Sequence, residues 1–319
     1  MNFKNGLSYT TKFGQAYCLD SLLGLGAMED ETINLVITSP PFALQRQKEY
    51  GNKDQETYIE WLAEFGRLVQ KKLKPDGSFV IDLGGAYQKG VPIRSLYNYK
   101  ILIKFCEEIG FHLAEEFFWY NPSKLPSPIE WVNKRKIRAK DSVNTVWWLS
   151  KSEWPKADVS KVLVEYSSRM KKLLKNPEEY YSPAKRPSGH DISASFAKDN
   201  GGAIPSNLLQ IPNSEASGGY LSVCKQMGTQ GHPARFPSKL PEFFIKLLTD
   251  PNDLVVDIFS GSNTTGMVAE ALGRRWVSFE ERLEYVASSS FRFLSLINTV
   301  NVRKVYEEIL SGRHVDIAY

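Results

Sequence analysis

Short apolar runs alternate with amphipathic segments along much of the chain. Runs typical of buried strands occupy residues 33–38, 78–83, 111–120, 143–150, 254–259 and 275–279. Apolar residues recur at helical spacing in 57–73, 96–109, 240–248, 267–272 and 283–297. This alternation predicts an α/β fold, in which a mostly parallel sheet is covered by helices. Ligands of such sheets bind beyond the carboxyl ends of the strands.

The middle of the chain lacks this pattern. Periodicity is weak from 151 to 231, where Pro, Ser, Gly and Asn are frequent. Because so long a stretch is rarely one structureless loop in a compact domain, it indicates a second, irregular module. We therefore expect three segments: 1–150, 151–231 and 232–319.

Composition narrows the class of protein. Apolar residues make up 42% of the chain and charged residues 24%, which excludes a largely disordered chain. Apolar runs such as 254–259 are far shorter than the roughly 20 residues that cross a bilayer. Residues 1–10 lack a signal pattern, so we expect a cytoplasmic protein without membrane contact. Three scattered cysteines and four histidines provide neither a disulfide framework nor a zinc cluster, and no metal site is expected.

The charge is unevenly distributed. Residues 121–190 hold 15 basic and 7 acidic side chains, whereas the rest of the chain holds 25 and 29. A basic block on an acidic body suggests an anionic partner, with nucleic acid as the leading candidate. A solvated basic face is the alternative.

Ser39-Pro40-Pro41-Phe42 follows the first predicted strand of the sheet. The prolines stop the strand and form a rigid shelf whose carbonyls are free to accept hydrogen bonds. Phe42 offers a stacking face, and the Ser39 hydroxyl can donate or accept. These parts suit the exocyclic amine of a nucleobase. A structural proline turn with a core Phe is the alternative.

A second unusual loop follows the strand at 254–259. Gly261 allows a tight turn and a close backbone approach to a ligand, while Asn263, Thr264 and Thr265 can cap the following helix. The loop lacks both the dinucleotide fingerprint and the Gly-Lys-Ser/Thr of phosphate-binding loops. Glu280, at the end of the next strand, can accept hydrogen bonds from ribose hydroxyls. An ordinary turn with an exposed Glu is the alternative.

Together these motifs resemble the beta group of S-adenosylmethionine-dependent DNA amino-methyltransferases. Ser39-Pro40-Pro41-Phe42 is similar to the catalytic motif in the form typical of cytosine-N4 enzymes, and 257–266 is similar to the methionine-binding loop. The segment 232–237 resembles the one that precedes this loop and helps to close the cofactor pocket. The resemblance extends over nearly the whole chain. It implies a Rossmann-like methyltransferase sheet, mixed but mostly parallel, with 151–231 inserted as a DNA-recognition module.

The resemblance also implies an activity and a cofactor. The enzyme would transfer the methyl group of S-adenosylmethionine to the N4 amine of a flipped cytosine in duplex DNA. By analogy, the site is the inner cytosine of CAGCTG, protected against a cognate restriction endonuclease. Ser260 stands where relatives often have Gly, and Asp20 fits loosely the acid that contacts the adenine. The implied cofactor residues are Phe236, Asp257, Phe259, Ser260, Gly261, Ser262, Asn263, Thr264, Thr265, Glu280 and Asp20.

The catalytic residues follow from the chemistry of the amine. Its lone pair is delocalised into the ring, so the enzyme must orient the amine and let it pyramidalise. We expect the Ser39 hydroxyl and the Pro40 carbonyl to accept its N–H bonds, on the shelf completed by Pro41, while Phe42 stacks on the extruded ring. Asp82 is a second candidate acceptor; positioning the cofactor and an ordinary strand-end acid are its alternatives.

Candidate DNA contacts lie in the basic block and in one loop. Lys134, Arg135, Lys136, Arg138 and Lys140 suit phosphates, and Lys185 and Arg186 are candidate base readers. Arg46 lies in the polar loop 43–56, which is expected either to close over DNA or to be a solvated surface loop.

Other activities remain open at this stage. An adenine-N6 methylase has the same fold, and both amines offer two N–H bonds. A non-catalytic DNA-binding protein on this scaffold is the alternative from another class. A cytosine-C5 methylase is disfavoured because it needs a nucleophilic thiolate, usually after Pro, whereas the three cysteines follow Tyr, Phe and Val. Oligomeric state is not settled by the sequence.

Overall fold

The computed structural model describes residues 6–42, 55–177, 198–213, 219–294 and 299–317. The chain divides into two compact units, Met1–Ala157 with Asn207–Tyr319 (unit 1) and Asp158–Ser206 (unit 2). The second unit is therefore shorter than the module expected at 151–231. Residues from 207 onward belong to unit 1, because a short strand there joins the main sheet.

Unit 1 is built on a ten-stranded sheet of order β10-β1-β2-β9-β8-β3-β4-β6-β5-β7. The central run from β2 to β4 is parallel throughout, whereas β6 is antiparallel to both β4 and β5, and β1 is antiparallel to β2. The predicted mixed, mostly parallel sheet is confirmed. The strands are β1 (Leu7–Thr10), β2 (Gly14–Cys18), β3 (Ile33–Thr38), β4 (Leu73–Leu83), β5 (His112–Tyr120), β6 (Val143–Ser150), β7 (Leu208–Gln210), β8 (Leu254–Asp257), β9 (Arg275–Glu280) and β10 (Val315–Asp316).

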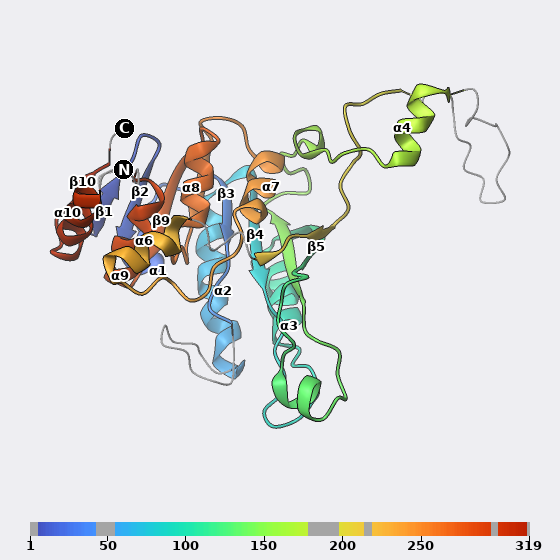
Figure 1. The fold of residues 1–319 in the computed structure, drawn as a ribbon, viewed down its shortest axis with the longest axis horizontal. Helices are drawn as coiled ribbons and strands as arrows, with labels where there is room; N and C mark the ends of the chain where they lie inside the picture. Colours follow the sequence, from blue (N-terminus) through green and yellow to red (C-terminus); the bar gives the residue numbers. More distant parts are fainter. Residues whose placement is uncertain (1–5, 43–54, 178–197, 214–218, 295–298, 318–319) are drawn as a thin grey trace. The chain divides into compact units, whose positions relative to one another are not determined.

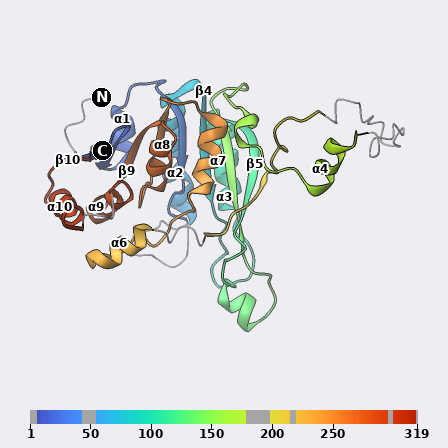
Figure 2. The ribbon, with the colours of Figure 1, turned by 45° about the horizontal axis from the view of Figure 1, so that its top comes forward.

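Helices cover both faces of this sheet (Figures 1 and 2). One face carries α1 (Ser21–Ala27), α2 (Gln55–Lys72) and α3 (Tyr97–Lys104), which is extended by a π-helical turn at Phe105–Ile109. The other face carries α7 (Lys239–Leu248), α8 (Thr264–Ala271) and α9 (Leu283–Ser289). α6 (Gly219–Met227) and α10 (Thr299–Leu310) pack near α9 and the 3-10 turn Ser290–Arg292 that follows it.

The main core lies between the sheet and the α2 face. Leu62 and Val69 of α2 and Phe79 of β4 are fully buried there, with Phe105 beside them. All six residues of β3 are buried, as expected of a central parallel strand covered on both faces. The strand ends at the edge of this core, where Ser39 and Pro40 begin the loop.

Two local features differ from simple expectation. Pro75-Asp76-Gly77, a sequence typical of turns, lies inside β4 as a bulge, because the register jumps from Ile33–Leu73 to Leu35–Ser78. The helix predicted at 283–297 ends at Ser289. The hydroxyls of Ser288, Ser289 and Ser290 each donate to the carbonyl three residues earlier, which competes with continuation of the helix.

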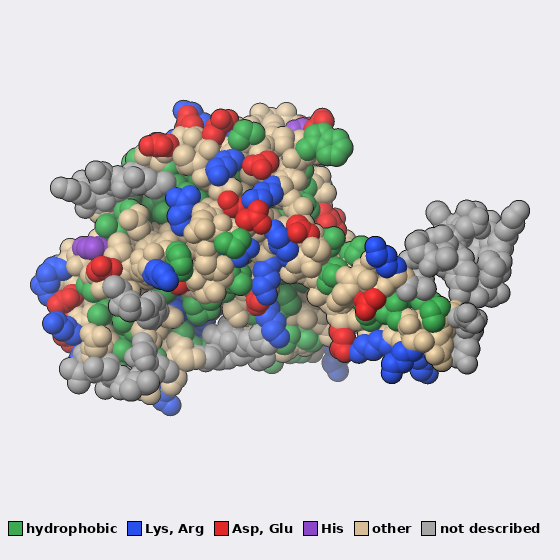
Figure 3. Space-filling view, turned by 90° about the horizontal axis from the view of Figure 1, so that it is seen from above, with side chains coloured by type: hydrophobic (Ala, Val, Ile, Leu, Met, Phe, Trp, Pro, Cys, Tyr) green, Lys and Arg blue, Asp and Glu red, His purple; other side chains and the backbone are tan. Residues whose placement is uncertain are grey.

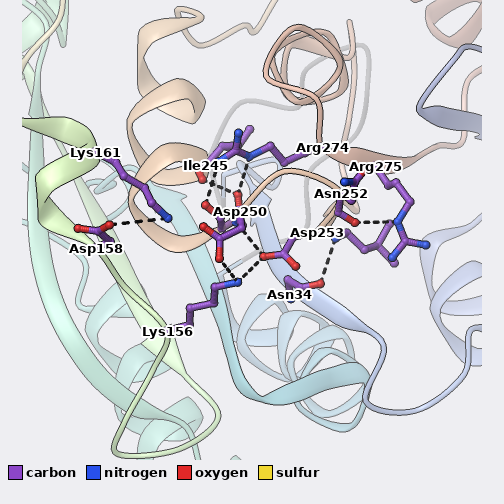
Figure 4. A network of polar contacts seen from close by, with 12 residues as sticks. Asn34, Lys156, Asp158, Lys161, Ile245, Asp250, Asn252, Asp253, Arg274 and Arg275 are labelled. Carbon is purple, nitrogen blue, oxygen red and sulfur yellow. Dashed lines mark hydrogen bonds and ion pairs between the residues drawn. The ribbon is translucent and has the colours of Figure 1, made fainter.

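A polar network fixes the amino-terminal edge of the sheet (Figure 4). The Lys156 ammonium lies 2.7 Å from a carboxylate oxygen of both Asp250 and Asp253. The Asn34 side chain accepts from the amide of Leu254 at 3.0 Å and so joins β3 to β8. The polar side chains at this edge bind one another. We therefore look for a ligand site at the carboxyl-terminal edge, where ligands of such sheets bind.

Unit 2 contains the 3-10 turn Val159–Val162 and α4 (Ser168–Lys175). Basic side chains gather over α4 in Figure 3, where Arg169, Lys171, Lys172 and Lys175 are exposed. Among the described residues of the whole chain, no helix is long and apolar enough to cross a membrane. Within the same residues, no cluster of three His, Cys, Asp or Glu side chains is arranged to hold a metal.

Candidate active site

A cavity of about 930 Å³ opens at the carboxyl ends of β3, β4, β8 and β9. These strands carry both unusual loops, so parallel pairing brings them to one edge of the sheet. Most of the predicted catalytic and cofactor residues line this one cavity: Ser39, Pro40, Pro41, Phe42, Asp82, Phe236, Phe259, Ser260, Gly261, Ser262, Thr264 and Glu280.

A chain of hydrogen bonds joins Ser39, Asp82 and Asn144 in the cavity wall. The Ser39 hydroxyl donates to Oδ2 of Asp82 at 3.1 Å, and Nδ2 of Asn144 donates to Oδ1 at 3.0 Å. β4 and β6 are antiparallel neighbours here, which sets Asn144 beside the end of β4. Because the Ser39 proton is engaged by Asp82, the oxygen lone pairs of Ser39 remain available to accept from a ligand.

Asp82 is a buried carboxyl group with an unusual titration. Only 4% of the residue is exposed. Burial raises the pKa of Asp82 to about 6, although the hydrogen bonds from Asn144 and Ser39 and the charge of Lys124 act in the opposite direction. A carboxyl group with a pKa this close to neutrality can take up or release a proton under physiological conditions.

Phe42 is placed by a glycine. A Cβ atom on Gly84 would lie 2.4 Å from the Phe42 ring, so only glycine allows the ring to lie against the end of β4. Phe42 packs at the margin of the main core and also lines the cavity. The sequence left two roles open for Phe42, a stacking face for a base or a core residue. The ring can fill both roles, because one part packs on the core and another faces the cavity.

The loop after β8 is organised by Asp257. Its carboxylate accepts from the Thr38 hydroxyl at 2.7 Å, the Thr265 hydroxyl at 2.6 Å and the Phe259 amide at 3.1 Å. Burial raises its pKa, and these three donors oppose the shift. Asp257 does not line the cavity. It connects the end of β3 to the loop, and so couples the two motifs.

Gly261 and Glu280 form the ligand-facing part of that loop. Gly261 has a φ of +51°, and a Cβ there would meet the His232 ring at 3.0 Å. Its amide donates to Oε2 of Glu280 at 3.0 Å, while the Arg282 amide donates to Oε1 at 3.0 Å. Burial raises the pKa of Glu280. Each carboxylate oxygen keeps a further lone pair, which can accept from a ribose hydroxyl.

Besides Asp257, three predicted cofactor residues lie in or beside this region without lining the cavity. Asn263, in a left-handed conformation, caps α8 by accepting from Gly266, and it donates to the Tyr9 hydroxyl. Thr265 is occupied by Asp257. Asp20 caps α1 by accepting from the Leu22 amide at 2.7 Å. Its neighbour Ser21 lines the cavity instead.

The segment 232–237 forms another wall. His232, Arg235 and Phe236 line the cavity, and Nδ1 of His232 bonds the Ala234 carbonyl at 2.6 Å. The His232 ring packs edge-on against Tyr285, with 4.5 Å between the ring centroids. This segment therefore lies against the cofactor loop, because the His232 ring is next to Gly261.

Several cavity residues were not identified from the sequence. Trp119, Lys124, Asn144 and Asn213 line the wall near the ends of β5, β6 and β7. Trp119 donates to the Ile211 carbonyl at 2.8 Å, and Nδ2 of Asn213 donates to the Arg235 carbonyl at 3.1 Å. Trp119 and Asn144 lie near the ends of the predicted strands 111–120 and 143–150, but no motif distinguished any of the four residues.

The predicted phosphate contacts lie on a projection, defined as loops 85–96 and 121–142. Arg94 and Asp141 form a paired salt bridge between the loops, each bond 2.9 Å long. Figure 1 shows the projection extending beyond the carboxyl end of the sheet. Lys134 and Arg135 both pair with Glu130.

Two further basic residues serve the projection itself. Arg138 donates to the Pro92 carbonyl, and Lys140 donates to the carbonyls of Pro122 and Lys124. Lys136 is exposed and makes no hydrogen bond or ion pair with another described residue. Arg46, Lys185 and Arg186 lie outside the described residues, so their predicted roles stay predictions.

Comparisons with known proteins place the chain in a family. A model of the N6/N4 methylase family, described as DNA methylase, matches residues 33–291. The Type II methyltransferase M.PvuII of Proteus hauseri is 62% identical over 99% of this chain and 95% of its own. A solved structure of the PvuII DNA methyltransferase (cytosine-N4-specific) has 55% identity and a TM-score of 0.82, and covers 99% of both chains.

A more distant structure shows the fold alone. The M1.HpyAVI–SAM complex is 20% identical, with a TM-score of 0.52, and covers 88% of this chain and 100% of that one. The expected Rossmann-like methyltransferase fold is thereby confirmed. The chain belongs to the N6/N4 family of S-adenosylmethionine-dependent DNA methylases.

Proposed function

We propose that this enzyme methylates the N4 amine of cytosine in duplex DNA, and that its site is the inner cytosine of CAGCTG. The observation that carries the proposal is the hydrogen-bonded chain Ser39–Asp82–Asn144, in the same cavity as the cofactor loop. The similarity to a cytosine-N4-specific enzyme over 99% of the chain supports the choice of base and, by analogy, the sequence read. We place the reaction in the cytoplasm, where bacterial DNA lies.

The cofactor fits the loop after β8. Glu280 offers carboxylate oxygens for the ribose, Gly261 brings backbone close to the ligand, and Phe236 and Phe259 provide apolar walls. When bound, S-adenosylmethionine supplies an electrophilic methyl group on a sulfonium. The loop's conformation is held by hydrogen bonds of three residues that do not line the cavity, Asp257, Asn263 and Thr265.

The chain's own groups then act on the amine. The target base must leave the duplex to reach the shelf, at a cost of a few kcal/mol of unstacking. Phe42 stacks on the ring, while Ser39 Oγ and the Pro40 carbonyl accept the two N–H bonds. These acceptors stabilise the positive charge that develops on nitrogen. Asp82 keeps the Ser39 proton turned away from the amine and receives the released proton through Ser39 Oγ.

DNA contacts complete the proposal. The projection and the basic surface over α4 each suit phosphates, because cations there greatly outnumber acids. Salt bridges such as those of Lys134 and Arg135 with Glu130 are exposed and weak, so they can exchange for phosphates. A cognate restriction endonuclease reading the same site remains the partner expected by analogy.

The decisive experiment follows labelled methyl groups. The protein is incubated with labelled S-adenosylmethionine and an unmethylated duplex containing CAGCTG, and the DNA is digested to nucleosides. Label in N4-methylcytosine is expected, and a duplex with CACGTG, of identical composition, should remain unlabelled. Label in N6-methyladenine would overturn the choice of base. Cofactor binding without transfer to any DNA would indicate a non-catalytic DNA-binding protein.

A Ser39→Ala variant supplies the matched control. Loss of one stabilising hydrogen-bond acceptor should lower turnover about 10²-fold or more. Affinity for S-adenosylhomocysteine should change little, since Ser39 lies on the amine side of the cavity. Full activity in this variant would remove Ser39 from the mechanism.

A further inference from the structure

The cavity extends to both sides of Ser39 along the edge of the sheet. One half lies at the ends of β8 and β9, with the cofactor loop and Glu280, and the other lies at the ends of β4, β6, β5 and β7. In the proposed function the cofactor fills the first half, so a base with its amine on Ser39 extends its ring into the second. We call this second half the base pocket. Its polar lining consists of Asp82, Asn121, Lys124, Ser142, Asn144 and Asn213.

Lys124 carries the only positive charge among the described residues that line the base pocket. The side chain is half-buried, and its ammonium forms no hydrogen bond or ion pair with another described residue. Its charge lowers the pKa of Asp82, which places the ammonium within electrostatic range of the amine end of the pocket. The three N–H donors of Lys124 are therefore available to a ligand.

The backbone around Lys124 is fixed where the projection leaves β5. The Lys124 amide donates to the Asn121 carbonyl at 3.2 Å, and the Asn121 amide donates to the Ser142 carbonyl at 2.9 Å. On the other side, Nζ of Lys140 donates to the Lys124 carbonyl at 3.2 Å. The start of the side chain is thus held at the pocket wall, while its flexible four-carbon stem lets the ammonium adjust to a ligand.

Two side-chain amides of the pocket already donate to the protein. Nδ2 of Asn144 donates to Asp82 at 3.0 Å, and Nδ2 of Asn213 donates to the Arg235 carbonyl at 3.1 Å. A charged donor also forms stronger hydrogen bonds than a neutral amide or hydroxyl. Lys124 is therefore the strongest donor that this pocket offers to a base.

Cytosine and adenine differ along the edge that continues from the amine. In cytosine the amine is followed by ring atom N3 and then by the O2 carbonyl, whereas in adenine it is followed by N1 and then by C2–H. A donor that reaches past the ring nitrogen meets an acceptor in cytosine and a carbon in adenine. A pocket with a donor there disfavours adenine, because the donor would be left unpaired.

We propose that Lys124 is a specificity-determining residue, which donates a hydrogen bond to the O2 carbonyl of the flipped cytosine and so favours cytosine over adenine. This inference rests on the proposed function, since it assumes a base amine at Ser39. The shelf does not make this choice, because both amines offer two N–H bonds to the same acceptors. The flipped base is read along the edge that pairing in the duplex would otherwise cover.

The test measures single-turnover methylation of two duplexes at saturating cofactor and DNA. One duplex has cytosine at the target position of CAGCTG, and the other has adenine there, opposite the same guanine. The unaltered protein should methylate cytosine faster. In Lys124→Met the rate on cytosine should fall about 10- to 100-fold, while the rate on adenine stays within about threefold. Lys124→Arg, which keeps a charged donor, should recover part of the preference.

A duplex with 2-thiocytosine at the target position gives a second measurement. It keeps the amine and N3, but replaces the O2 oxygen by sulfur, which is a weaker acceptor. The sulfur should slow the unaltered protein and have little further effect on Lys124→Met. Lys100→Met, on the exposed side of α3 and outside the cavity, is the matched control and should treat all three duplexes like the unaltered protein. Lys124→Met should also keep the melting temperature and the affinity for S-adenosylhomocysteine.

Equal losses on cytosine and adenine would overturn the proposal. They would assign Lys124 to a DNA phosphate if the slope of log DNA affinity against log salt also falls. They would assign it to the charge balance of Asp82 if the loss disappears at a pH well above 6. An equal effect of 2-thiocytosine on the unaltered protein and on Lys124→Met would overturn it as well.

Failure of the proposed function has a different signature, because it shows in the unaltered protein. Methylation of neither base would remove the activity itself, and adenine methylated as fast as cytosine would remove the choice of base. If the unaltered protein prefers cytosine and Lys124→Met keeps that preference in full, only the role of Lys124 fails.

Discussion

Two buried aspartates end neighbouring parts of the same sheet, Asp82 on β4 and Asp257 on β8, with β3 between them. They are 4% and 2% exposed, and burial raises the pKa of both. They differ in their surroundings. Asp257 is enclosed by three donors from the protein, whereas Asp82 accepts from Ser39 and Asn144 and lines the cavity. Burial and a raised pKa therefore do not by themselves indicate that a carboxyl group takes part in the reaction. Access to the ligand cavity is what distinguishes Asp82 from Asp257.

The largest expected effect is that of Asp82→Asn on turnover. Asn fits the same space, but it cannot accept the proton that leaves the amine. Turnover should fall about 10²- to 10⁴-fold. Steady-state kinetics at saturating cofactor measures this, with affinity for S-adenosylhomocysteine as the control. Unchanged turnover would show that Asp82, like Asp257, has only a structural role.

The same substitution should stabilise the fold at neutral pH. The pKa of Asp82 is about 6 in the folded protein and about 3.9 when unfolded, so folding favours the protonated form. The stability this group contributes is present below pH 4 and is lost as pH rises through 6. Asp82→Asn should therefore unfold with a free energy higher by roughly 2 kcal/mol at pH 7.5, and the gain should vanish near pH 4. Denaturant melts at both pH values measure it.

Asp257→Asn should lower the stability of the fold more than it lowers turnover, which is the reverse of Asp82→Asn. One amide cannot replace both carboxylate oxygens as acceptors, so a donor is left unpaired. The free energy of unfolding should fall by about 1–3 kcal/mol, with weaker binding of S-adenosylhomocysteine. Turnover at saturating cofactor should change less than in Asp82→Asn. Thr265→Val, which removes one donor to Asp257, is the milder control. Unaltered stability in both variants would contradict the structural role.

The pH profile gives a finer distinction. Turnover should fall as pH drops through about 6, because protonated Asp82 no longer orients Ser39. In Asn144→Leu the midpoint should move upward, since the hydrogen bond from Asn144 lowers the pKa of Asp82. Single-turnover rates across pH 5–8 test both points. A midpoint that stays fixed in Asn144→Leu would assign the titration to another group.

The smallest effect is expected on the projection. Lys136→Ala should lower the slope of log DNA affinity against log salt by about one. Arg138→Ala should change the slope less and lower the melting temperature of the protein slightly, because Arg138 holds the Pro92 loop. Equal slopes for both variants and the unaltered protein would show that Lys136 does not contact a phosphate and is only a solvated surface residue.

The sequence predicted the buried strands of the sheet but missed several short elements. β3, β4, β8 and β9 were predicted because buried parallel strands are nearly continuous apolar runs. The antiparallel β6 was predicted from its apolar run as well. β1, β2 and α1 were missed, because these short elements carry mixed residues such as Ser8, Gly14 and Gln15. Tertiary pairing, which no local pattern reports, decides such elements.

The site shows the same division. Ser39, Asp82 and Glu280 were identified because each ends a predicted strand. Asn144 was not, because its role depends on antiparallel pairing of β6 with β4. Asp257 was identified as a cofactor residue, and only its hydrogen bonds place it behind the cavity wall. Sequence patterns locate the edge of the sheet where the site lies, but not which side chains face the ligand.

The bond between Thr38 and Asp257 joins residues 219 positions apart. During synthesis, β3 leaves the ribosome long before β8, and β2 waits still longer for β9. The centre of the sheet can close only when the chain is almost finished, so folding here depends on contacts of very high sequence separation. A chain released early would hold exposed strand edges and only part of the cavity. Competence to methylate therefore arises only late in synthesis, when β8 and β9 join the strands made first.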